Sequence, residues 1–246
     1  MARSIKFGGH DFSSFSTAEV VLPAAHGIVV DAAEVPGRAG AALLSTRIPP
    51  KTLRVRLFLD LADDEDAEGL SVVCHEVASW LVSDAGCDLE LPGEPGLVYR
   101  DVVCTDAGAW NGLFEDGSCE LAFMAFDPVA WGQEQEVIAP AGSAELSVLV
   151  GGTHRTWPTF VMEASAGDGV VVEDAGTGSC VEVERAFLGG EEVIVDCASG
   201  RAWVDGEAAD ADVTLGSDFF WLEPGLHELS FTGCTDFTTN FTERWL

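Results

Sequence analysis

The residues best suited to chemistry are a Cys-His pair and a third sulfur, Cys74-His75 and Cys87. Thiolate and imidazole groups are ligands that zinc prefers, yet this spacing fits none of the usual zinc-ligand patterns. Cys74 falls on the apolar face of a predicted helix, whereas His75 points away from that face. We therefore interpret these residues as structural, and the sequence predicts neither a metal site nor another cofactor.

Two groups of carboxylates are the next candidates. The run Asp63–Asp66 lacks the alternating ligands, the central glycine and the terminal glutamate of a calcium loop, so we interpret it as a cap for the helix that follows. Glu182 and Glu184 resemble a glycosidase pair in type only, because they alternate with Val181 and Val183 and should lie on the outward face of a strand. The sequence also lacks the nucleophilic-serine, phosphate-loop and zinc-protease motifs. We therefore predict no catalytic residue and a protein that is not an enzyme.

Seven tryptophans leave one binding function open. Tryptophans of a β-sandwich can stack on sugar rings, although most tryptophans serve in cores and interfaces. A carbohydrate-binding module is therefore an alternative function, and it would require exposed, coplanar aromatic rings in the second half of the chain.

Most of the elements that position these residues are predicted strands. Residues 53–61 have period-two alternation, with apolar Leu53, Val55, Leu57, Leu59 and Leu61 between Arg54, Arg56, Phe58 and Asp60. Shorter strands are expected over 4–7, 17–22, 28–34, 44–48, 87–91, 97–105 and 118–126, and Pro49-Pro50 should interrupt the sheet. The one clear helix is expected over 67–82, where Leu70, Val73, Cys74, Val77, Trp80 and Leu81 form an apolar stripe, with Gly86 as a stop signal.

We predict that the second half of the chain consists of β-strands. Glycine-rich turns recur between short alternating segments, a pattern typical of a sandwich. In the last strand Phe237, Phe241 and Trp245 should share one face, with Arg244 among the polar residues of the other. The polar run after Trp131-Gly132 marks a boundary, so we predict domains over 1–132 and 133–246.

The net charge of −30 restricts the partners. No segment forms a basic stripe, which argues against tight binding to nucleic acid or to an anionic membrane surface. No apolar run reaches the ~18–20 residues of a membrane span, and the N-terminus does not resemble a signal peptide, so we expect folding in a cytoplasm. Seven cysteines with scattered spacing are then expected to be free thiols that serve as small apolar residues.

Several short motifs, in order along the chain, resemble one family. They are Phe7-Gly8-Gly9, Pro36-Gly37-Arg38-Ala39-Gly40, Asp127-Pro128 with Trp131-Gly132, Gly151-Gly152-Thr153 with Trp157-Pro158, and the ending Glu243-Arg244-Trp245-Leu246. Together they resemble the distal tail proteins of long-tailed, siphovirus-type phages and prophages. The family pattern has Asp where this chain has Ala39, which puts the role of that loop in question.

The resemblance implies a mainly β fold, with an N-terminal β-sheet domain that carries one helix and a C-terminal galectin-like β-sandwich. It implies a homo-hexameric ring at the virion tail tip, made and assembled in the host cytoplasm, that joins the tail tube to the tip and receptor-binding proteins. DNA would pass through the ring without specific binding. Another baseplate component remains an alternative, and Arg38, Arg47, Arg54 and Arg56 are candidate bases for contacts between subunits.

Overall fold

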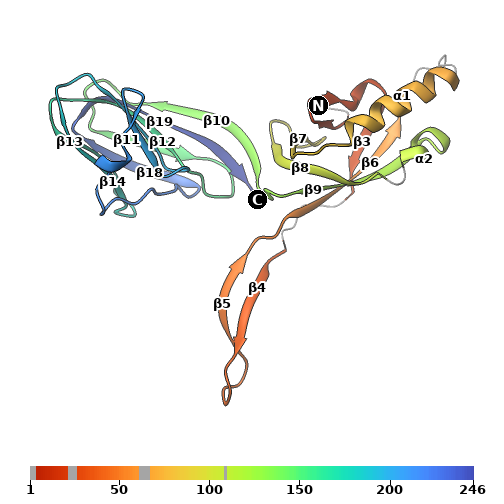
Figure 1. The fold of residues 1–246 in the computed structure, drawn as a ribbon, viewed down its shortest axis with the longest axis horizontal. Helices are drawn as coiled ribbons and strands as arrows, with labels where there is room; N and C mark the ends of the chain where they lie inside the picture. Colours follow the sequence, from red (N-terminus) through yellow and green to blue (C-terminus); the bar gives the residue numbers. More distant parts are fainter. Residues whose placement is uncertain (1–3, 22–26, 61–66, 108–109) are drawn as a thin grey trace. The chain divides into compact units, whose positions relative to one another are not determined.

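The structure is a computed structural model that describes residues 4–21, 27–60, 67–107 and 110–246, with side chains left out at 67–73, 111–112 and 114. It divides into two compact units, Met1–Trp131 with Leu246, and Gly132–Trp245. Strands make up most of each unit (Figure 1), so the predicted mainly β fold is confirmed.

The first unit is an antiparallel sheet with two helices. Strand β6 pairs with β3 on one side and β9 on the other, and β9 continues through β8, β7 and β1 to β2. Strands β4 and β5 form a separate two-stranded ribbon. The strands are β1 (Lys6–Phe7), β2 (His10–Asp11), β3 (Ser16–Val20), β4 (Val29–Glu34), β5 (Ala41–Arg47), β6 (Lys51–Leu59), β7 (Cys87–Glu90), β8 (Val98–Asp106) and β9 (Ser118–Ala125), with a 3-10 turn at Phe12–Ser14; β10 (Ala130–Ile138) begins here.

Strand β6 confirms the period-two prediction as far as Leu59, whereas Leu61 lies outside the described residues. Leu53, Val55 and Leu57 are at most 1% exposed, whereas Arg54 and Arg56 between them are exposed. Alternation of this kind places every second side chain in the core. The two prolines before β6 separate it from β5, as expected of residues that cannot donate a ladder hydrogen bond.

Helix α1 (Ala67–Trp80) is the predicted helix and ends two residues earlier than expected. Val77 and Leu81 are buried, while Trp80 is only half-buried. The indole of Trp80 stacks on His10 at 4.5 Å and meets Phe12 edge-on at 5.6 Å between ring centroids. The capping role expected of Asp63–Asp66 lies outside the described residues.

The predicted role of Gly86 as a helix stop is wrong, because α1 ends six residues earlier. Instead, Gly86 leaves room for Asp101 of β8, since a Cβ at Gly86 would lie 1.9 Å from Asp101 Oδ1. Asp101 itself has the unusual φ of +54°. The second helix, α2 (Trp110–Glu115), was not predicted, because its six residues are too few to show a helical repeat.

The second unit is a two-sheet sandwich. One sheet has the order β11-β18-β13-β14, and the other contains β17-β16-β15-β12-β19-β10. Inward side chains of both sheets, such as Val148, Phe160, Val172 and Phe231, form one core. The strands are β11 (Glu145–Val150), β12 (Thr159–Ala164), β13 (Gly167–Asp174), β14 (Cys180–Phe187), β15 (Glu192–Asp196), β16 (Arg201–Val204), β17 (Glu207–Ala208), β18 (Gly225–Thr232) and β19 (Cys234–Trp245), with a 3-10 turn at Asp210–Asp212.

The alternation predicted for the last strand holds only in part. Phe237 and Phe241 are buried, as expected. Arg244 was expected among the polar residues of the open face, yet it is 8% exposed. Its guanidinium lies 5.9 Å from the centroid of the Trp157 ring, so packing against an aromatic ring buries a residue that the pattern assigned to solvent.

Candidate assembly surfaces

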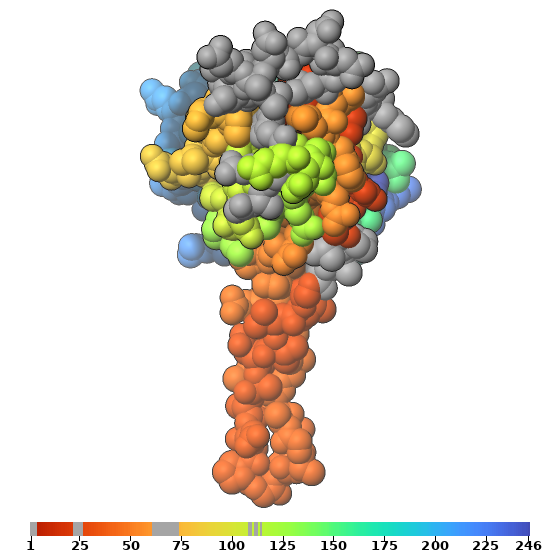
Figure 2. Space-filling model, turned by 90° about the vertical axis from the view of Figure 1, so that its right-hand side faces the viewer, coloured from red at the N-terminus to blue at the C-terminus, as the bar shows by residue number. Residues whose placement is uncertain are grey.

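The most conspicuous surface of the first unit is the β4–β5 ribbon, which we call the arm (residues 27–50). It projects away from the rest of that unit (Figure 1), and Figure 2 shows it as a narrow extension. Gly37 and Gly40 in its terminal turn have φ near +80°, a conformation that glycine adopts without strain. The family-type loop from Pro36 to Gly40 therefore forms the tip of the arm.

The arm exposes apolar side chains on both strands. Ile28 is 66% exposed, Val30 56%, Leu43 65% and Leu44 67%. An isolated two-stranded ribbon is marginally stable in water, and contiguous exposed apolar residues usually mark an interaction site. These properties make the arm the strongest candidate assembly surface among the described residues.

The arm is also electrically neutral in a highly acidic chain. Asp31 and Glu34 balance Arg38 and Arg47, whereas the whole chain carries −30. Among the described ion pairs, none involves Arg38 or Arg47. The arm can therefore approach another acidic surface without net repulsion and offers it two cations.

The other two candidate bases occupy a different place. Arg54 Nη1 and Arg56 Nη2 lie 3.3 Å and 3.4 Å from the two carboxylate oxygens of Glu120 on the neighbouring strand β9. All three side chains are substantially exposed, so solvent screening leaves each pair worth little in stability. The structure thus places Arg38 and Arg47 on the arm, and Arg54 and Arg56 in an ion pair within one sheet.

The motif at Phe7-Gly8 is structural. Phe7 is fully buried and its ring lies 5.1 Å from that of Phe123. Gly8 has φ +57° and donates its N–H to the carbonyl of Asp88, which starts the turn into β2. These residues place the N-terminal strands against the core of the first unit.

The Asp127-Pro128 motif closes the first unit. Asp127 accepts hydrogen bonds from Trp131 Nε1 at 2.8 Å and from the Val129 N–H at 3.2 Å. Arg100 stacks on Trp131 with its guanidinium carbon 4.2 Å from the ring centroid. In the second unit, Gly132 packs closely against the last strand, because a Cβ there would lie 3.0 Å from Trp245 Nε1 and 3.2 Å from the carbonyl oxygen of Glu243.

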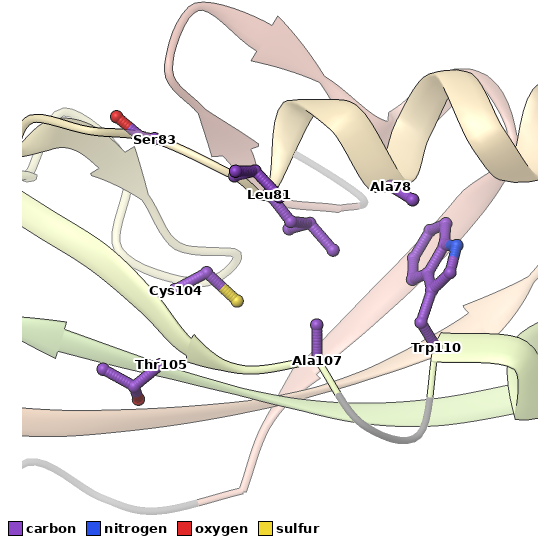
Figure 3. A pocket seen from close by; sticks show the side chains of 8 residues that line it. Ala78, Leu81, Ser83, Cys104, Thr105, Ala107 and Trp110 are labelled. Carbon is purple, nitrogen blue, oxygen red and sulfur yellow. The ribbon is translucent and has the colours of Figure 1, made fainter.

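A groove opens in the first unit between the end of α1 and the end of β8 (Figure 3). Trp110 lines it and donates from Nε1 to the carbonyl of Cys74. Burial raises the pKa of Cys104 to about 11, which keeps this thiol protonated and unreactive near neutral pH. The groove has a volume of about 480 Å³, and the described residues that line it carry no charge: Ala78, Leu81, Val82, Ser83, Cys104, Thr105, Ala107 and Trp110.

The residues first considered for chemistry are dispersed. Within the described part of the chain, no three His, Cys, Asp or Glu side chains come together as a metal site. Glu182 and Glu184 lie on β14, where Thr214 Oγ1 contacts Glu182 and Glu184 is exposed. All seven cysteines are free, with Cys119 and Cys197 buried and the other five intermediate. None of the described helices is long and apolar enough to cross a membrane.

The second unit matches a known family in sequence. Residues 151–245 match the siphovirus-type tail component, C-terminal domain. No curated protein matches the chain significantly.

Solved structures extend the likeness to the first unit. The crystal structure of SPP1 Dit, described as a paradigm of the hub adsorption apparatus in phages that infect Gram-positive bacteria, superposes with a TM-score of 0.74, covers 98% of both chains and is 18% identical. Two structures of the phage P2 baseplate in its activated conformation, with Ca and with Sr, are more distant. Their TM-scores are 0.45 and 0.42, each at 9% identity, and they cover 92% and 93% of this chain and 90% and 89% of theirs. Residues 151–245 therefore belong to the siphovirus-type tail component family, and the whole chain has the fold of a siphovirus distal tail protein.

Proposed function

We propose that the protein is the subunit of a homo-hexameric ring at the distal end of a siphovirus-type phage tail. There it joins the tail tube to the tip and its receptor-binding proteins, as a structural protein without catalysis. The family match over residues 151–245 carries this proposal, and the likeness to SPP1 Dit over nearly the whole of both chains supports it.

The arm supplies a physical reason for self-association. Leu43 and Leu44 are about two-thirds exposed, and burying a leucine side chain contributes about 1.5–3 kcal/mol. A neighbouring subunit can cover them, while its carboxylates pair with Arg38 and Arg47. Arg54 and Arg56 are weaker candidates for subunit contacts, because they already share Glu120.

The acidity suits a ring through which DNA passes. A bore lined with Lys and Arg would release counterions from the DNA backbone and hold the DNA. The chain has only 12 bases against 42 acids, so an acidic or neutral bore is expected and the genome would slide without specific binding.

Native mass spectrometry of the full chain tests the proposal. We expect a hexamer for the unmodified protein and a monomer for the double variant Leu43→Asp, Leu44→Asp, because two buried charges at the contact would oppose association. Leu188→Asp is the matched control, since Leu188 is 91% exposed in the second unit, and this variant should remain hexameric.

Two outcomes would contradict the proposal. One is a monomer at every concentration, both alone and when mixed with the tail-tube protein of the same phage. The other is an equal loss of the hexamer in the arm variant and in Leu188→Asp, which would point to general repulsion rather than to contacts of the arm.

A further inference from the structure

The second unit holds few cations among many acids. Residues 134–246 contain 21 Asp and Glu but only four Arg and no Lys. Two of these arginines form ion pairs: Arg185 lies 3.6 Å from Asp212, and Arg201 lies 3.3 Å from Asp210. Because carboxylates greatly outnumber arginines in this unit, an arginine without a carboxylate partner is unusual and is a candidate for binding a ligand.

Arg155 is that arginine. Its side chain is partly exposed, and among the described residues it forms neither an ion pair nor a side-chain hydrogen bond. Its Nε is buried without an acceptor. The guanidinium is instead held by aromatic rings, with its central carbon 4.4 Å from the centroid of Trp221 and 5.4 Å from that of Trp157.

The two indoles form a corner rather than a flat platform. Their centroids are 6.4 Å apart and their planes are inclined by 65°, so this pair does not provide the coplanar rings that a two-tryptophan sugar platform requires. Trp221 is 44% exposed, and its Nε1 donates to Glu223 Oε1 at 2.9 Å, which orients the ring. Arg244 lies on Trp157 as well, at 5.9 Å, and adds positive charge to the same cluster.

We propose that Arg155 and Trp221 bind a sugar ring that carries one anionic group, either a carboxylate or a phosphate. A guanidinium can bind either a carboxylate or a phosphate through two parallel hydrogen bonds. Contact with aromatic rings displaces water from the guanidinium. The exposed indole of Trp221 offers an apolar surface on which the sugar ring can pack. Nearby carboxylates such as Glu223 can accept hydrogen bonds from the sugar hydroxyls.

The surrounding charge favours this ligand over an acidic protein segment. The acidic residues of this unit would repel a peptide segment with several carboxylates. A sugar with a single negative charge is repelled less, and one arginine can neutralise that charge. The site lies within the second unit and does not depend on the proposed hexameric ring.

Saturation-transfer NMR and calorimetry on the full chain test the site, with glucuronic acid and glucose 6-phosphate as probes and glucose as the uncharged reference. At least one anionic sugar should bind in preference to glucose, and added salt should weaken its binding. Arg155→Gln should reduce the affinity at least about tenfold, because a hydrogen bond to a charged group is lost. Trp221→Ala should reduce it about three- to tenfold.

The unit contains its own matched control. Arg201 lies over Trp203 at 5.4 Å, as Arg155 lies over Trp221, but Arg201 is already paired with Asp210. Arg201→Gln should therefore leave sugar binding unchanged. The proposal is overturned if neither anionic sugar binds, if glucose binds equally well, if Arg201→Gln weakens binding as much as Arg155→Gln, or if a pentaglutamate peptide binds at this site and the sugars do not.

Discussion

Lys51 Nζ donates a hydrogen bond to Tyr99 Oη over 3.0 Å, directly after the two prolines at the base of the arm. Lys51 is 8% exposed, and its ammonium also lies 4.6 Å from the centroid of the Tyr99 ring. Burial lowers the pKa of Lys51, although the negative charge of Glu94 opposes this effect. Burial and the Glu94 carboxylate both raise the pKa of Tyr99.

Stability should therefore depend on pH in the alkaline range. Between the lowered pKa of folded Lys51 and the 10.5 of the unfolded state, the unfolded chain binds more protons, so the free energy of unfolding should rise with pH. Above pH 10, unfolded Tyr99 loses a proton that the folded state keeps, so stability should fall. Lys51→Met should abolish the rise and keep the fall, as measured by urea unfolding at a series of pH values.

Lys6→Met is the control for this experiment. Lys6 is the only other lysine of the chain, and its side chain is 45% exposed beside Glu90. It should retain the rise in stability with pH. A rise of the same slope in Lys51→Met would show that burial of Lys51 is not its cause.

Trp80→Ala tests how α1 is attached to the sheet. Complete burial of this indole would predict a loss of about 3–5 kcal/mol, but Trp80 is half-buried against His10, Phe12 and Phe15, so we expect about 2–3 kcal/mol. Val82→Ala, at a position that is 78% exposed, should change stability by less than about 0.5 kcal/mol. Chemical denaturation measures both, and equal effects would mean that Trp80 does not anchor the helix.

We also propose that the two units fold independently, close to the predicted boundary at residue 133. A fragment of residues 132–246 contains the whole core of the sandwich, so it should give a cooperative thermal transition and a β-type circular dichroism spectrum. An unfolded fragment would show that this core requires the first unit. Proteolysis is less informative here, because Gln133–Glu136, the polar run at the predicted boundary, lies within strand β10.

Salt should favour assembly of the proposed ring. Six copies carry 180 net negative charges, and the screening length falls from ~30 Å at 0.01 M to ~10 Å at 0.1 M salt. The hexamer population, followed by light scattering, should therefore rise over this range. Dissociation on addition of salt would mean that ion pairs, such as those expected of Arg38 and Arg47, outweigh the repulsion.

Local patterns in the sequence were sufficient for much of the fold. Period-two alternation from Leu53 to Leu57 predicted a half-buried strand, because successive strand residues point to opposite faces. The apolar stripe through Val77 and Leu81 predicted α1, because residues three or four apart lie on the same face of a helix. The ordered motifs from Phe7 to Trp245 also indicated the family, since each marks a turn or a packing contact that the fold requires.

Only the tertiary structure decided which surfaces remain uncovered and which distant charges meet. A strand pattern over residues 28–34 does not reveal whether the strand joins a larger sheet. In the part of the chain that the structure describes, β4 pairs with β5 alone, and Leu43 is left exposed. Arg244 is buried against Trp157, which lies 87 residues earlier in the sequence, and Arg155 lies between Trp157 and the distant Trp221, so both arrangements depend on segments far apart in the chain. Periodicity reports the two faces of one element, whereas burial and ion pairing depend on what packs against each face.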